Sequence, residues 1–207
     1  MGSTVYYCAA SLDGYIAESD DTIEWLTGYD GTVDAPEGLE RGPLAPGGPY
    51  ERFYEGVGAM ISGSVTYEFI LGHTPSGTDW PYRGKPYWVL SARDLPVPDD
   101  AADDVRVLSA SVRDLIDDMR SAADGRDIWI IGGGNVASQF ADEGLLDEVH
   151  VTVVPVVLGS GKPLFDRRLQ DGPLKLLGTN VFANGMVELR YAHQHFTKPI
   201  RSGRMPP

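Results

Sequence analysis

Short runs of β-branched and other apolar residues alternate along the chain with stretches whose apolar positions recur at helical spacing. The runs predict buried strands at residues 5–10, 59–61, 87–90, 105–108, 128–131 and 149–157. A helix is expected to begin at Ser111, because one apolar stripe follows it at Val112, Leu115, Ile116 and Met119. Strands that alternate with helices predict an α/β fold with a mostly parallel central sheet and helices on both faces.

The last part of the sequence has a different pattern. Residues 174–179 and 186–193 resemble two strands, and a polar turn at Asn184 and Gly185 separates them. We expect them to form an antiparallel hairpin at the edge of the sheet. Pro155 predicts a bulge or an edge position in the strand at 149–157, because proline cannot donate a backbone hydrogen bond.

The apolar run at 128–131 stops at three glycines, in the segment DIWIIGGGNVASQF of residues 127–140. This pattern predicts a strand that enters a helix through a glycine turn, with the helix at 137–142. Glycine can take a positive φ and lets the backbone approach a ligand, while the first N–H groups of the helix point outward. Such a turn can bind an anion. The alternative is that the glycines only make a tight connection.

Two more strand ends carry residues suited to phosphate. SGSVTYE follows the strand at 59–61 and predicts a second helix start, and LSAR follows the strand at 87–90 with the Ser91 hydroxyl and the Arg93 guanidinium. Ligands of open α/β sheets bind beyond the carboxyl ends of the strands. The three ends together indicate a dinucleotide site, although the chain lacks the usual GxGxxG spacing.

Composition limits the classes of partner. The 207 residues suit one domain, expected at 1–196, followed by a flexible tail at 197–207. The formal charge of −13 argues against nucleic acid and anionic membranes as partners. No apolar run could cross a bilayer and no secretory signal is visible, so we expect a cytoplasmic protein. No histidine and cysteine spacing predicts a metal site, and the single Cys8 is expected to be a buried strand thiol.

Five segments in order resemble a known family: AASLDGYIA, ISGSVTYE, VLSAR, WIIGGGNVASQF and DEVHVTVVPVVLGSGKPLF. The chain is similar to the dihydrofolate reductase superfamily. Within it, the chain most resembles the branch of the C-terminal pyrimidine reductase domain of the bifunctional riboflavin-biosynthesis deaminase-reductase. The resemblance covers nearly the whole chain and implies a dihydrofolate reductase-like fold that uses NADPH.

The resemblance also implies which residues contact the cofactor. The nicotinamide would be flanked by Ala10 and Ile16. The phosphates would lie against Gly63, Ser64, Val65, Thr66, Gly132, Gly133, Gly134, Asn135 and Val136. The adenosine 2′-phosphate would be bound by Ser91, Ala92 and Arg93. Ser64 departs from the family pattern, which has an arginine at this position, so the preference for NADPH over NADH rests mainly on Arg93.

The substrate side is expected in the first part of the chain. Reduction of a C=N bond needs a proton donor, and a carboxylate whose pKa is raised by burial is the usual one. Glu24 and Asp30 are the candidate catalytic acids; the alternative is that each is a helix cap or a solvated loop residue. Trp25, at the base of a Gly- and Pro-rich loop at 27–49, and Lys162 are candidate substrate contacts.

The sequence therefore predicts an NADPH-dependent reductase that transfers a hydride to a small conjugated heterocycle of pterin or aminopyrimidine type. Two alternatives stay open. The substrate could be an unrelated C=N or C=C compound. The chain could also be a degenerate nucleotide-binding sensor or assembly module, which Ser64 and the uncertain acid favour. The apolar strand at 149–157 and the hairpin predict a homodimer.

Overall fold

A computed structural model of the chain describes residues 2–31, 38–74, 80–169 and 172–193. The tail expected at 197–207 lies outside the described residues. Within the described residues, no helix is both long enough and apolar enough to cross a membrane.

The strands form where the apolar runs predicted them. Six of them pair in parallel: β1 Thr4–Ser11, β3 Val57–Gly63, β4 Tyr87–Leu90, β5 Val105–Leu108, β6 Asp127–Gly132 and β7 Glu148–Val154. The hairpin is β9 Lys175–Val181 with β10 Val187–Ala192, and β10 pairs antiparallel with β7. A separate small sheet joins β2 Tyr15–Ala17 to β8 Lys162–Pro163.

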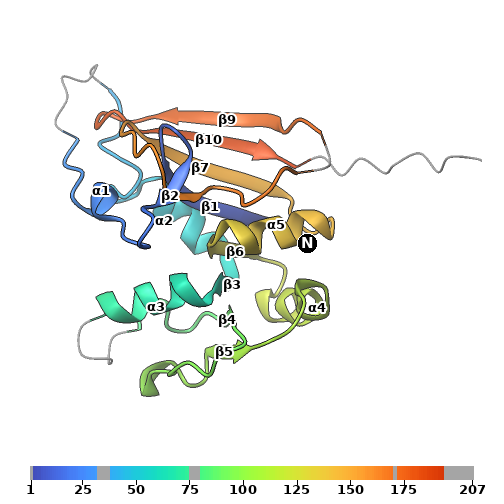
Figure 1. Cartoon of the computed structure of the whole chain (residues 1–207). Helices are drawn as coiled ribbons and strands as arrows, with labels where there is room; N and C mark the ends of the chain where they lie inside the picture. Colours follow the sequence, from blue (N-terminus) through green and yellow to red (C-terminus); the bar gives the residue numbers. More distant parts are fainter. Residues whose placement is uncertain (1, 32–37, 75–79, 170–171, 194–207) are drawn as a thin grey trace, which may run out of the picture.

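The large sheet has the order β5-β4-β3-β6-β1-β7-β10-β9. Figure 1 shows it with β9 at the top of the view and β5 at the bottom. The prediction of a mostly parallel sheet with an antiparallel hairpin at its edge is confirmed. The edge strand β9 exposes Leu176, Leu177 and Val181, and the homodimer stays a prediction.

The helices are α1 Glu24–Thr27, α2 Pro49–Gly56, α3 Ser64–His73, α4 Val112–Ala123 and α5 Gly134–Asp142, and a short 3-10 helix lies at Asp99–Ala101. On one face of the sheet, α4 and α5 pack against Tyr6, Ile61 and Ile130. On the other face, α2 and α3 pack against Tyr7 and Met60. Side chains alternate between the two faces along each strand, which is why Tyr6 and Tyr7 enter different cores.

Single residues determine where several helices and strands begin or end. Ser111 caps α4, because its hydroxyl accepts a hydrogen bond from the Asp114 N–H at 3.2 Å. The predicted start of α5 at residue 137 was wrong: Gly133 has φ +91°, which ends the strand, and the helix begins at Gly134. The strand predicted at 149–157 ends at Val154, just before Pro155, which lacks the N–H that a continued ladder needs.

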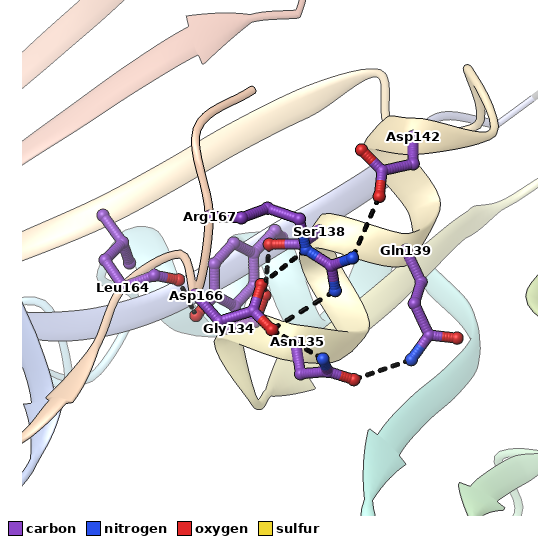
Figure 2. A network of polar contacts seen from close by, with 9 residues as sticks. Gly134, Asn135, Ser138, Gln139, Asp142, Leu164, Asp166 and Arg167 are labelled. Atoms are coloured by element: carbon purple, nitrogen blue, oxygen red, sulfur yellow. Dashed lines mark hydrogen bonds and ion pairs between the residues drawn. The ribbon is translucent and has the colours of Figure 1, made fainter. Parts of the chain in front are cut away.

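A carboxylate network ties the segment after β8 to the first turns of α5. The Asn135 amide donates to Asp166 at 2.6 Å, and Arg167 donates to both Asp166 and Asp142. Figure 2 shows these side chains beside the helix. Partial burial would raise the pKa of Asp166, but hydrogen bonds from Arg167, Asn135 and Ser138 outweigh it and lower the pKa to about 2. This network holds the segment after β8 against the beginning of α5.

The core predicts a matched pair of stability variants. Leu146 is buried in the core under α4 and α5, whereas Leu176 is 53% exposed on β9. We expect Leu146→Ala to lower the free energy of unfolding by about 2–5 kcal/mol, because it leaves a cavity in a packed core. Leu176→Ala should change it by no more than about 0.5 kcal/mol. Urea unfolding of both variants measures the difference, and equal losses would contradict this description of the core.

The low pKa of Asp166 predicts a pH-dependent contribution to stability. Because the pKa lies below the ordinary value of 3.8, the carboxylate stabilises the fold above that pH, and this contribution is lost as the pH falls toward about 2. Asp166→Asn should therefore be less stable than the parent at neutral pH, and the gap should narrow on acidification. Urea unfolding between pH 7 and pH 2 measures it. The exposed Asp103→Asn is the control, and a gap independent of pH would contradict the assignment.

Candidate cofactor and substrate site

The turns that end β3 and β6 meet at the carboxyl edge of the sheet. A Cβ placed on Gly133 would lie 3.6 Å from Val136 Cγ2 and 4.0 Å from the backbone nitrogen of Gly63. A Cβ on Gly132 would lie 2.8 Å from Thr66 Oγ1, closer than real Cβ contacts allow. Glycine at these positions therefore lets two strand-to-helix turns pack directly against each other. The structure brings together the two glycine segments that the sequence analysis assigned to one site.

Both helices that begin here lack a side-chain cap. The residues before α3 and α5 are Gly63 and Gly133, which have no side chain to accept a hydrogen bond from the first N–H groups of either helix. By contrast, α4 is capped by Ser111. The first backbone N–H groups of α3 and α5 thus have no side-chain acceptor at the cap position, and the partial positive charge of each helix start adds to theirs. Such a pair of helix starts suits a ligand with two neighbouring phosphate groups.

Ser91 and Arg93 lie beyond the end of β4, the strand next to β3. The Ser91 hydroxyl accepts from the Arg93 N–H and donates to the Arg93 carbonyl, both at 2.9 Å, so the turn is closed on itself. The Arg93 guanidinium donates two hydrogen bonds to the Glu68 carboxylate, at 2.9 and 2.7 Å. These bonds raise the pKa of Arg93. Glu68 ends the SGSVTYE segment, and no sequence pattern assigned it a role.

The turn between β1 and β2 is held by Asp13. Its carboxylate accepts from the Ser11 hydroxyl at 2.7 Å and from the N–H groups of Leu158 and Gly159 at 3.1 and 2.7 Å. The hydrogen bond from Ser11, helped by those from the backbone, lowers the pKa of Asp13. Asp13 thereby joins this turn to the segment after β7.

Ala10 is buried on β1 opposite Val153.

Three large apolar side chains stay exposed around this edge. Leu12 follows β1 and is 64% exposed, Val65 is the second residue of α3 and is 50% exposed, and Val157 follows β7 and is 68% exposed. The backbone of Leu12 is hydrogen-bonded to Val156 at 2.8 Å, so the first and third of these segments are adjacent. An open hollow of about 390 Å³ includes Val157 in its lining, together with Glu18, Ser19, Asp20, Leu158 and Ser160. Apolar surface beside polar groups is typical of a small-molecule site.

The two candidate acids are both exposed to solvent. Glu24 is the first residue of α1 and is exposed, and Asp30 is exposed in the loop that follows. Neither is buried in an apolar pocket. Trp25, between them in sequence, packs against a small apolar cluster that contains Val154, Phe182 and Met186.

The loop around residues 27–49 contacts the hairpin turn. The Tyr29 hydroxyl donates to the Asn184 carbonyl at 2.6 Å, and the Ala183 and Asn184 N–H groups donate to the carbonyls of Glu40 and Arg41. Its described part therefore lies on the β7 and β10 side of the sheet. Residues 32–37 lie outside the described residues.

Lys162 is not available as an isolated cation. Its ammonium group lies 3.3 Å from the Asp21 carboxylate, and Glu18 and Asp20 line the hollow nearby. No sequence pattern pointed to Asp166, whose hydrogen bonds with Asn135 and Arg167 hold the segment after β8 against α5. There, a Cβ on Gly134 would lie 2.6 Å from the carbonyl oxygen of Pro163.

Comparisons with known proteins agree with this architecture. The chain is 35% identical over 189 residues to the uncharacterized protein YwjB of Bacillus subtilis (strain 168), covering 91% of this chain and 96% of YwjB. It is similar to a solved structure from Shewanella sp. PV-4, provisionally assigned to riboflavin biosynthesis, with a TM-score of 0.72 and 27% identity over 93% of this chain and 99% of that one.

A second solved structure shares the fold. It is the diaminohydroxyphosphoribosylaminopyrimidine deaminase/5-amino-6-(5-phosphoribosylamino)uracil reductase of Thermotoga maritima, with a TM-score of 0.59 and 16% identity over 92% of this chain and 56% of that protein. The sequence model of the family described as the RibD C-terminal domain matches residues 4–188. The chain therefore belongs to the RibD C-terminal domain family.

Proposed function

We propose that this protein is an NADPH-dependent reductase that transfers a hydride to a small conjugated heterocycle of pterin or aminopyrimidine type. The observation that carries the proposal is the contact between the turns at Gly63 and Gly133, which places the uncapped starts of α3 and α5 side by side. The fold alone would not fix an activity. Membership of the RibD C-terminal domain family is the observation that supports a reductase.

The residues fit a dinucleotide. The two helix starts can hold its phosphates through backbone N–H groups, which do not depend on the arginine that Ser64 replaces. In the sheet, β4, which leads to Ser91 and Arg93, lies on one side of the pair β3 and β6. The strand β1, which carries Ala10, lies on the other side of that pair. We assign the adenosine end to the β4 side and the nicotinamide end to the β1 side. When bound, the cofactor supplies the hydride.

The β1 side suits the substrate. Leu12 and Val157 offer exposed apolar surface to a flat ring, and the loop that Tyr29 and Asn184 hold against the hairpin turn lies on the same side. The Asp13 hydrogen bonds keep the segments that carry Leu12 and Val157 in place. This surface is separate from the turns assigned to the phosphates, so cofactor and substrate could be bound together.

Loss of NADPH absorbance with a panel of aminopyrimidines and pterins tests the activity. We expect turnover with at least one flat heterocycle of this class, and a direct titration should show NADPH binding without substrate. If the chain bound neither NADPH nor NADH, the proposal would be contradicted.

A second candidate is a nucleotide-binding protein without reductase activity. The exposure of Glu24 and Asp30 favours it, because neither carboxylate is buried in an apolar pocket beside a substrate. The same pair of measurements separates the candidates: binding of the cofactor without turnover of any compound in the panel would favour the second one.

The glycine turn predicts a specific loss of cofactor affinity. Gly133 has φ +91° and its Cβ would stand beside Val136 and the Gly63 amide, so Gly133→Ala should disturb the phosphate site. We expect NADPH binding to weaken on the order of tenfold, the size of one lost hydrogen bond to a charged group.

Gly125→Ala is the matched control. Gly125 also has a positive φ, +77°, but no atom lies within 4 Å of its added Cβ, and it stands after α4 and away from the site. Both variants carry the same kind of backbone strain, so both should lower the melting temperature. Only Gly133→Ala should change the dissociation constant of NADPH, measured by titration calorimetry. Equal affinities in the two folded variants would remove the basis for the phosphate assignment.

A further inference from the structure

Arg93 and Glu68 form a two-hydrogen-bond ion pair at the carboxyl edge of the sheet. The carboxylate comes from α3, which begins at the end of β3, and the guanidinium follows β4. Their side chains are 41% and 58% exposed, so the pair faces solvent at the side of the site assigned above to the adenosine end. Arg93 is the one basic residue in the segments SGSVTYE and LSAR that build this corner.

NADPH and NADH differ only by the 2′-phosphate on the adenosine ribose. A phosphate group there needs a cation with donors directed at it, and a guanidinium suits it well. In this chain both donor nitrogens that face α3 are already bonded to a carboxylate. A phosphate would have to displace Glu68 and would then lie close to its negative charge. A ribose 2′-hydroxyl, by contrast, can donate a hydrogen bond to a carboxylate.

We propose that Glu68 is a specificity-determining residue that weakens the discrimination of this protein in favour of NADPH over NADH. This inference rests on the proposed function, because it takes a dinucleotide in the assigned orientation. It depends on two features of the corner together. Glu68 occupies the guanidinium of Arg93, and Ser64 supplies no second cation for the phosphates.

The experiment compares the dissociation constants of NADPH and NADH for the full chain at one fixed ionic strength. In Glu68→Gln the carboxylate is replaced by an amide of the same shape, and Arg93 keeps its charge. We expect NADPH to bind on the order of tenfold more tightly than in the parent, while NADH stays within about twofold. The ratio of the two dissociation constants is the readout, and it does not depend on turnover.

Glu143→Gln is the matched control. Glu143 pairs with Arg113 of α4, and the exposed fractions of that pair, 43% and 60%, are almost those of Glu68 and Arg93. It removes one negative charge from a protein of formal charge −13, as Glu68→Gln does, but outside the site. The ratio should stay at the parent value in this control.

Arg93→Gln provides a second, independent variant. It leaves Glu68 without its cation, so NADPH should weaken more than NADH and the ratio should move in the opposite direction. A ratio within twofold of the parent in Glu68→Gln or in Arg93→Gln, or an equal gain for both dinucleotides in Glu68→Gln, would overturn the inference. Failure of the parent to bind either dinucleotide would instead overturn the proposed function, and the assignment of Glu68 with it.

Discussion

The site depends on how closely two backbone turns can approach each other. The ends of β3 and β6 meet at Gly63 and Gly133, and side chains at Gly132 or Gly133 would either collide with Thr66 or force a φ that other residues rarely adopt. Because neighbouring parallel strands are held at a fixed spacing by their ladder, the helices that follow them start side by side. The glycines allow this close approach, because Gly63 and Gly133 place no side chain between the two turns.

The large elements of the fold could be predicted from local pattern. Hydrophobic runs located the parallel strands, the Ser111 cap located α4, and the turn at Asn184 located the hairpin. Element ends were less predictable where glycine was involved. Gly134 is a poor helix former, so the sequence pattern favours a later start for α5, yet the turn at Gly133 aims the chain directly into the helix. Proline marked the end of β7 more accurately than the apolar pattern did.

The site was predictable as far as its backbone, and less so in its side-chain partners. Glycine segments indicate where a helix start is open, but the pairing of Arg93 with Glu68 joins residues 25 positions apart on two different elements. The same holds for Lys162 with Asp21 and Arg167 with Asp142, which also pair across distant parts of the sequence. In a chain with so large an excess of acids, the basic groups of the site acquire carboxylate partners, and backbone N–H groups carry more of the attraction for an anion.

The position of β1 has a consequence for folding. This first strand lies in the middle of the sheet, between β6 and β7, and the backbone N–H groups of Ser3, just before it, and Thr4 donate to the carboxylates of Asp127 and Asp147. Its partners β6 and β7 therefore leave the ribosome only after the elements α2, β3, α3 and α4 have been made. Pairing between such distant segments is slow, because a long loop must close before any contact forms. During synthesis β1 stays an unpaired apolar strand, exposed to association with other chains, until β6 and β7 emerge.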